Sequence, residues 1–323
     1  MIPPELSIDN IRFTYNKIKP FINKTPFLRG SKKINEYFSS NIYFKCEFLQ
    51  KSGSFKARGA INNIISQDKN NFNKGITAVS AGNHAIAASF VANLFQLNNK
   101  IFLYESANQH RIKICKNYGA NIKFTNPKQA FVDAENAQKE GYYFIHPFDG
   151  PYTLQGSATL GLEITEYFKI LGKKLDYLII SVGGGGLISG VSSYVKQIFP
   201  DTKIIGVEPE GARGMSDSLN LGKPLDNIKV NTIADSLSAP LHMKYSFDVA
   251  KENIDEMITV SDEEMKKYML FAFDNLKLML EPACVAGLAA IKNKLRNKLK
   301  NKNSLVILCG SNIDKITWNE LTN

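Results

Sequence analysis

The segment KSGSFKARGA holds a lysine whose surroundings favour chemistry over simple solvation. Lys56 follows a Ser-Gly-Ser turn and stands beside Phe55, where an apolar helix is expected to begin. Loss of hydration at such a position lowers the pKa of a lysine from its ordinary value of about 10.4. The resulting neutral amine attacks carbonyl carbons and forms Schiff bases. The alternative is an ordinary surface lysine that carries a solvated charge.

Four consecutive glycines form the second candidate. Gly183 to Gly186 follow the buried-strand pattern YLIISV, and LISGVSSYVKQIF then predicts a helix. Residues without side chains let backbone N–H groups converge on an anion, and a helix N-terminus adds favourable partial charge, so the run predicts a phosphate site. No Gly-Lys-Ser/Thr follows, which excludes the Walker pattern. The third glycine of a dinucleotide fingerprint would fall on Ile188 or Ser189, so that motif is not matched either.

An acidic residue keeps a nicotinamide oxidoreductase open as an alternative. Glu208 ends the next strand pattern, KIIGVE, roughly where a ribose-binding carboxylate stands in a dinucleotide-binding fold. This interpretation requires the glycines to bind a dinucleotide rather than a single phosphate group.

Both candidates must be positioned by the elements around them. Short β-branched or aromatic runs alternate with longer helical patterns from about residue 41 onward. This rhythm is typical of repeated βαβ units and predicts an α/β fold with mostly parallel sheets. Open α/β sheets bind ligands beyond the carboxyl ends of their strands, which is where both candidates are expected. The predicted strands lie in NIYFKCEFLQ, GITAVSA, KIFLYES, NIKFT, YYFIHP, YLIISV, KIIGVEP and LVILC.

Six motifs occur in an order that resembles one enzyme family over nearly the whole chain. They are SGSFKARGA, SAGNHAIA, SVGGGGLISG, EPEGA, EPACVAG and LCGSNID. They resemble fold-type II pyridoxal phosphate enzymes, in particular the serine/threonine dehydratase and serine racemase group. The resemblance implies a two-domain, tryptophan synthase β-like α/β fold, with mostly parallel sheets and helices on both faces. It also implies a large cofactor-binding domain of residues 1–74 and 149–323 and a small mobile domain of residues 75–148.

The resemblance also assigns the cofactor, pyridoxal 5′-phosphate, to particular residues. Lys56 would carry the covalent link and act in catalysis, Asn83 would hydrogen-bond the phenolic oxygen, and Cys309 would lie opposite the pyridine nitrogen. The phosphate would be bound by Gly183, Gly184, Gly185, Gly186 and Leu187. The substrate carboxylate would be bound by Ser80, Ala81, Gly82 and His84, in a loop that opens a predicted helix and so offers N–H groups to an anion. For His84, a catalytic base and a hydrogen-bonded helix-start histidine are both open.

Two residues bear on the choice of reaction. A neutral thiol at Cys309 cannot protonate the pyridine ring as a carboxylate would. This disfavours transamination and makes elimination the easier reaction. Racemases of this group carry a second serine where this chain has Ala81, so the acid/base on the face opposite Lys56 is missing. We therefore expect a dehydratase (ammonia-lyase) that converts L-threonine or L-serine to a 2-oxo acid and ammonia. A serine or aspartate racemase and a 3-hydroxyaspartate dehydratase are the alternatives on the same fold.

Two further departures from the family pattern concern a metal and the substrate. The metal site of relatives uses the glutamate of the EPEGA segment, here Glu208, and an aspartate six residues later. This chain has Gly214 at that position and Asp217 three residues beyond. We therefore expect no divalent metal, with Glu208 as the residue that would contribute if one were bound. Ser236 stands where many relatives carry glycine next to the cofactor ring.

Composition excludes several other classes of protein. The net charge is +10 over 323 residues, but the lysines are spread among asparagines without an arginine-rich patch interleaved with aromatics, so no nucleic-acid partner is expected. The four cysteines show neither metal-type spacing nor a disulfide framework. No apolar run reaches the ~18 residues of a membrane span, and the first residues show no secretion signal. We expect a cytoplasmic protein that binds a small hydroxy-amino acid and, by family resemblance, forms a homodimer.

Overall fold

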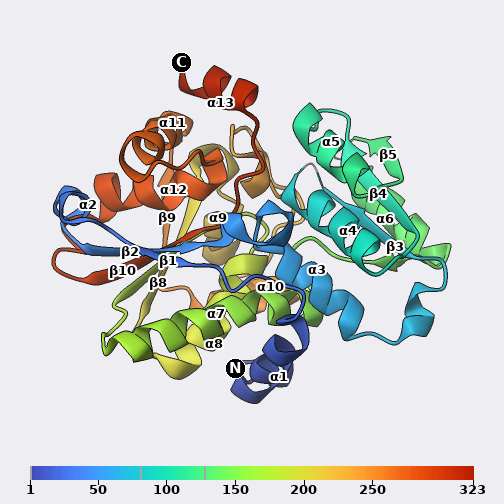
Figure 1. Cartoon of the computed structure of the whole chain (residues 1–323), viewed down its shortest axis with the longest axis horizontal. Coiled ribbons are helices and arrows are strands. Elements are labelled where there is room, and N and C mark those ends of the chain that lie inside the picture. Colours follow the sequence, from blue (N-terminus) through green and yellow to red (C-terminus); the bar gives the residue numbers. More distant parts are fainter. Residues whose placement is uncertain (1, 81, 127–128) are drawn as a thin grey trace.

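The strands of the chain form two sheets in the computed structural model, which describes residues 2–80, 82–126 and 129–323 (Figure 1). The strands are β1 (Phe27–Arg29), β2 (Asn41–Cys46), β3 (Ile76–Val79), β4 (Asn99–Tyr104), β5 (Ile122–Thr125), β6 (Tyr143–Phe144), β7 (Tyr177–Ser181), β8 (Lys203–Pro209), β9 (Glu256–Val260) and β10 (Asn303–Leu308). One sheet has the order β1-β2-β10-β7-β8-β9, and the other has the order β5-β4-β3-β6.

All neighbouring strands run parallel except β1, which pairs antiparallel with β2 at the edge of the larger sheet. The predicted α/β class with mostly parallel sheets is therefore confirmed. Each predicted strand segment contains a strand, whereas β1 and β9 were not predicted. Three residues are too few to show a strand period in β1, and most of β9 is only partly buried at the other edge of the sheet.

Helices cover both faces of the larger sheet, and Figure 1 shows α7, α8 and α10 on one side of it and α11 and α12 on the other. This cover explains why YLIISV and LVIL are continuous apolar runs, because parallel strands are buried on both faces. Among the described residues, no helix combines the length and hydropathy that a membrane crossing requires. The helices are α1 (Ile8–Ile18), α2 (Lys32–Phe38), α3 (Lys56–Ile65), α4 (Asn83–Leu94), α5 (Gln109–Asn117), α6 (Ala130–Lys139), α7 (Pro151–Leu171), α8 (Gly186–Ile198), α9 (Gly214–Leu221), α10 (Lys244–Asn253), α11 (Asp262–Phe271), α12 (Pro282–Ala290) and α13 (Lys315–Thr322).

The smaller sheet lies beside the larger one with α4, α5 and α6 around it (Figure 1). Helices α3 and α4 pack together in a buried apolar cluster that contains Ala57 and Ile61 of α3 and Ala87 and Val91 of α4. Because α3 also contributes Lys56, this cluster connects the smaller sheet to the candidate site. The two-domain boundaries given above and the mobility of residues 75–148 stay predictions.

Four buried charged side chains fix the position of α3. Arg58 donates to both carboxylate oxygens of Glu47 at 2.8 Å and to one oxygen of Glu163 at 2.9 Å. Lys45 on β2 donates to the other oxygen of Glu163 at 2.6 Å. Burial raises the pKa of Glu47, but the charge and hydrogen bonds of Arg58 outweigh it, so that the pKa ends below its ordinary value. Two cations and two anions thus neutralise one another between α3, α7 and the larger sheet.

We predict that Arg58→Met lowers the free energy of unfolding by about 3–5 kcal/mol, because buried Glu47 loses its cationic partner and Glu163 keeps only Lys45. Urea unfolding followed by circular dichroism measures the change. Arg12→Met is the matched control, since Arg12 is exposed and lies 3.8 Å from an exposed Asp9, and it should cost less than about 1 kcal/mol. Equal losses in the two variants would contradict the role of the buried network.

Candidate active site

Lys56 is the first residue of α3, and the loop before it is bonded to the end of β10. The N–H of Phe55 donates to the carbonyl of Cys309 at 3.0 Å, and the N–H of Ser311 donates to the carbonyl of Gly53 at 3.1 Å. Gly53 has φ +73°, a left-handed conformation that glycine adopts without strain. The turn predicted from SGS therefore brings Lys56 beside Cys309, which lies about 250 residues further along the chain.

The Lys56 amine is held in the wall of a cavity. Its Nζ donates to the carbonyl of Pro147. Burial lowers the pKa of Lys56 to about 8, and the nearby Cys309 opposes that shift. A substantial fraction of the amine is therefore neutral near pH 8. This agrees with the desolvated lysine expected from KSGSFKARGA.

The glycine run forms a close-packed loop between β7 and α8. A Cβ on Gly183 would lie 2.9 Å from the backbone of Leu237, and one on Gly184 would lie 2.3 Å from the ring of Phe148. Gly185 has φ +92°. The first bond of α8 runs from the N–H of Ser189 to the carbonyl of Gly185, so the N–H groups before it have no partner within the helix. The glycine loop thus presents backbone N–H donors that no side chain of the loop's glycines covers.

The loop after β3 lies at the same cavity and opens α4. Ser80 Oγ accepts the N–H of Gly82 at 3.0 Å. Ala81 lies outside the described residues. His84 is buried, and its Nε2 lies 2.8 Å from the carbonyl of Ile145. Burial, followed by the charge of Lys56, lowers the pKa of His84 to about 3, which makes its ring neutral and favours the helix-start interpretation over a catalytic base.

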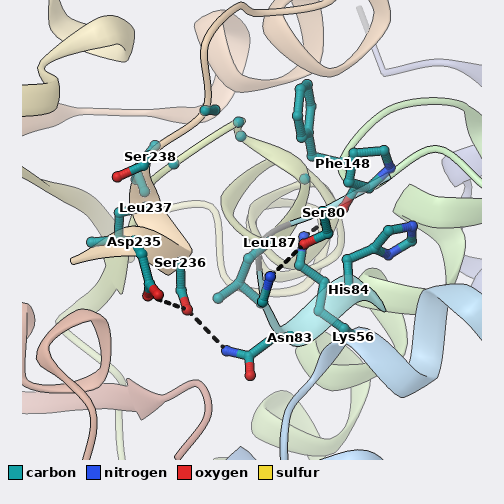
Figure 2. A pocket seen from close by; sticks show the side chains of 18 of the residues that line it. Lys56, Ser80, Asn83, His84, Phe148, Leu187, Asp235, Ser236, Leu237 and Ser238 are labelled. Atoms are coloured by element: carbon teal, nitrogen blue, oxygen red, sulfur yellow. Dashed lines mark hydrogen bonds between the residues drawn. The ribbon is translucent and has the colours of Figure 1, made fainter. Parts of the chain in front are cut away.

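Asn83 joins this loop to the larger sheet. Its Nδ2 donates to Glu281 at 2.7 Å and to Ser236 at 3.2 Å, while its Oδ1 accepts from Asn312 at 2.7 Å. Figure 2 shows the bond between Asn83 and Ser236 at the cavity. Asn83 thus begins α4 beside the smaller sheet and is hydrogen-bonded to three residues beside the larger sheet. Its predicted hydrogen bond to a cofactor oxygen would replace the bond to Ser236.

A cavity of about 150 Å³ connects these groups. Figure 2 shows Lys56, Ser80, Asn83 and His84 on one side and the segment from Asp235 to Ser238 on the other. All the described residues that were predicted for the site line it, namely Lys56, Ser80, Gly82, Asn83, His84, Gly183, Gly184, Gly185, Gly186, Leu187 and Cys309. The structure therefore brings together segments that are far apart in sequence.

Several lining residues were not predicted from the sequence. Three aromatic side chains, Tyr104, Phe131 and Phe148, line the cavity on the side of the smaller sheet, and Asp235 and Leu237 line it on the side of the larger sheet. Tyr104 ends β4 and Phe148 follows β6. Because ligands bind beyond the carboxyl ends of parallel strands, both residues could have been predicted to lie at the site. Neither has a motif of its own, and Phe131 lies within an ordinary helical pattern.

Both carboxylate oxygens of Glu208 accept backbone N–H groups. The donors are the N–H groups of Met215 and Ser216, each at 3.0 Å, at the start of α9. Burial raises the pKa of Glu208 to about 7, against those hydrogen bonds. Asp217 is partly exposed and lies 3.4 Å from Arg213. No group of three metal-ligating side chains occurs within the described parts of the chain.

The residues present fit pyridoxal 5′-phosphate. A lysine amine with a lowered pKa suits the cofactor aldehyde, and the N–H groups at the start of α8 suit its phosphate. The hydroxyl of Ser181, which lines the cavity two residues before Gly183, is buried and has no protein partner among the described residues. Such an unpaired buried group favours a ligand at this position.

Comparisons with known proteins agree with this geometry. A family model described as pyridoxal-phosphate dependent enzyme matches residues 18–310. Phenylserine dehydratase of Ralstonia pickettii is 40% identical over 279 residues, covering 86% of this chain and 84% of the relative. L-threonine ammonia-lyase of Thermotoga maritima is 33% identical over 314 residues, covering 96% and 76%. The structure of maize serine racemase superposes with a TM-score of 0.88 at 31% identity, covering 98% and 96%.

We predict that Gly184→Ala weakens binding of pyridoxal 5′-phosphate by more than about tenfold. The added Cβ would collide with Phe148 and displace the backbone N–H groups of the glycine loop. Titration of the visible absorbance of the cofactor measures the affinity. Gly119→Ala is the control: a Cβ on Gly119 meets no neighbouring atom, although its φ of +74° strains an alanine locally, so the variant should bind the cofactor normally. Unchanged affinity in Gly184→Ala would show that the loop has another role.

Proposed function

This chain belongs to the family of pyridoxal-phosphate dependent enzymes, and on that premise we propose that it is an ammonia-lyase that removes water and ammonia from a small 3-hydroxy amino acid. L-threonine and L-serine are the proposed substrates, and a 2-oxo acid and ammonia are the proposed products. Relatives with ammonia-lyase, dehydratase and racemase names share the fold, so the choice between elimination and racemisation must come from the residues of this chain.

The observation that carries the proposal is the Lys56 amine. Its pKa of about 8 makes it available as a base, and its position in the cavity wall is fixed by α3. When bound, the cofactor supplies an aldehyde for a covalent link to amines and withdraws electrons from the substrate α-carbon. In the proposed reaction Lys56 takes the α-proton, and loss of the 3-hydroxyl as water leaves an enamine that hydrolyses to the 2-oxo acid and ammonia.

Other residues bind and orient the reactants. The loop of Ser80, Ala81, Gly82 and His84 is proposed to bind the substrate carboxylate at the start of α4, and Asn83 to contact the cofactor. Gly183 to Leu187 are proposed to hold the phosphate, and Cys309 to face the pyridine nitrogen. In racemases of the group, the resemblance assigns the second acid/base to a serine at the position of Ala81, and alanine has no proton to donate. This favours elimination.

We predict that the unaltered enzyme converts L-threonine and L-serine to 2-oxo acid faster than to the opposite enantiomer, and that Ala81→Ser gains racemase activity. Removal of the α-proton needs one base, whereas racemisation also needs a proton donor on the other face. A keto-acid assay beside chiral chromatography measures both products, with Lys56→Ala as the inactive control. Racemisation that outpaces elimination in the unaltered enzyme would overturn the assignment.

A bulkier substrate is a second candidate, favoured by the aromatic wall of the cavity. The ring centroids of Phe131 and Phe148 lie 6.4 Å apart, and Tyr104 lines the same side. The dehydratase of Ralstonia pickettii that is 40% identical to this chain is named for phenylserine. We therefore propose 3-aryl-3-hydroxy amino acids as alternative substrates, with the aryl group packed against these rings.

We predict that Phe131→Ala lowers kcat/KM for phenylserine about tenfold but changes kcat/KM for L-threonine much less, because only the aryl substrate loses a ring contact. A substrate panel read out as 2-oxo acid measures both values. Phe13→Ala, which alters a 64% exposed phenylalanine on α1, is the control and should leave both unchanged. Equal losses for the two substrates would assign Phe131 a structural role only.

A further inference from the structure

His146 follows β6 and is a buried histidine without a role in the proposed reaction so far. Its Nδ1 accepts the N–H of Asp149 at 2.9 Å and the N–H of Phe148 at 3.3 Å. Burial, with smaller contributions from His84 and Lys56, lowers the pKa of His146 to about 3, so the ring is neutral. A neutral imidazole has one donor and one acceptor. Since Nδ1 is the acceptor, Nε2 carries the hydrogen.

The Nε2–H of His146 has no protein partner within the described residues, although the atom is buried. The ring cannot easily turn to find one, because it packs against Phe148 and Phe144 at centroid distances of 4.7 Å and 5.5 Å, and against Phe131 at 5.7 Å. A buried unpaired donor costs about 1–3 kcal/mol. The buried Nε2–H of His146 therefore requires a hydrogen-bond acceptor, and no described protein group supplies one.

A small cavity lies against His146 and shares Lys56 and His84 with the main one. Its volume is about 10 Å³, which is room for the centre of one water molecule. The lining residues include Lys56, His84, His146, Thr153 and Ser157. His84 bonds a carbonyl through Nε2, so its hydrogen is on that atom and its Nδ1 is left as an acceptor. The residues that line this cavity thus include His146 with an unpaired donor, His84 with an acceptor nitrogen, and Lys56.

We propose that one ordered water occupies this cavity and acts as a hydrogen-bond acceptor for Lys56, with His146 as the positioning residue that orients it. The water accepts a hydrogen bond from His146 Nε2–H and donates one to His84 Nδ1. Its second lone pair accepts a hydrogen bond from the amine of Lys56. Three hydrogen bonds are usual for a buried water. His146 acts through the water and does not touch the substrate.

The water matters when Lys56 carries a proton. A neutral amine that takes the substrate proton becomes an ammonium with three donors, and the carbonyl of Pro147 accepts only one of them. The titratable groups near it include no carboxylate. They are Cys309, which follows β10, and the neutral rings of His84 on α4 and of His146 after β6. The water supplies a second acceptor, which stabilises the ammonium and holds it near the α-carbon for the return of the proton.

The test separates this role from simple support of the loop. In His146→Asn, the amide oxygen replaces Nδ1 as acceptor for Phe148 and Asp149, but nothing replaces Nε2–H. In His146→Gln, an amide N–H reaches the Nε2 position. We expect His146→Asn to keep cofactor absorbance and KM while kcat falls about tenfold, the size of one hydrogen bond to a charged group. We expect His146→Gln to recover most of that loss. Wild-type kcat in His146→Asn would overturn the proposal.

A high-resolution crystal structure of the unaltered holoenzyme gives a readout that needs neither a variant nor catalysis. The proposal expects a water within hydrogen-bond distance of His146 Nε2 and His84 Nδ1. A dry cavity, or a protein group on Nε2, would contradict it even if the variants fail to fold. The inference rests on the proposed function for the role of Lys56, but the two fail separately: absence of 2-oxo acid production contradicts that function, and a dry cavity contradicts the water.

Discussion

The buried ion pairs of Arg58 are the interaction on which the active site depends. Arg58 lies two residues after Lys56 on α3, and its guanidinium meets Glu47 and Glu163 at once. Removing ions from water costs several kcal/mol each, and only close pairing offsets that cost. Helix α3 therefore has one rotational setting in which both carboxylates are satisfied. In that setting the side chain of Lys56 points into the cavity.

A second set of polar contacts determines how the two sheets meet at the cavity. Arg111 on α5 donates to Glu281 at 3.3 Å, to the carbonyl of Asn312 at 2.9 Å and to Asp235. Its guanidinium is only 4% exposed. Asn83 reaches the same Glu281 from the start of α4. Elements around the smaller sheet are thus attached to the larger one directly beside the predicted cofactor site, and the carboxyl ends of strands from both sheets face one cavity.

The cavity combines polar side chains with little charge. Burial lowers the pKa of Lys56 to about 8 and that of His84 and His146 to about 3, so both imidazoles are neutral and the amine is often so. Low charge suits a site whose ligand brings its own phosphate and carboxylate groups. It also means that each hydrogen bond in the site counts for more than it would in water.

The sequence by itself determined the fold class and predicted which segments form the site. Alternating strand and helix patterns predicted parallel sheets, and the motifs around Lys56, Ser80 and Gly183 predicted the segments that line the cavity. These signals are local: a lysine at a helix start, glycines after a strand and a hydroxyl before a helix each require only a few adjacent residues. The resemblance added the order of the motifs and therefore the cofactor.

Only the tertiary structure decided which other side chains complete the site. Phe131 and Phe148 line the cavity, and His146 becomes a buried donor, because α6 and the segment after β6 pack beside strand ends that are far away in the sequence. The neutral state of His84 likewise depends on its burial and on a carbonyl 61 residues away. Each carboxylate oxygen of Glu208, which the sequence analysis considered for a ribose or a metal, accepts a backbone N–H group at the start of α9. Burial and long-range hydrogen bonding are properties of the packed chain, and no local pattern encodes them.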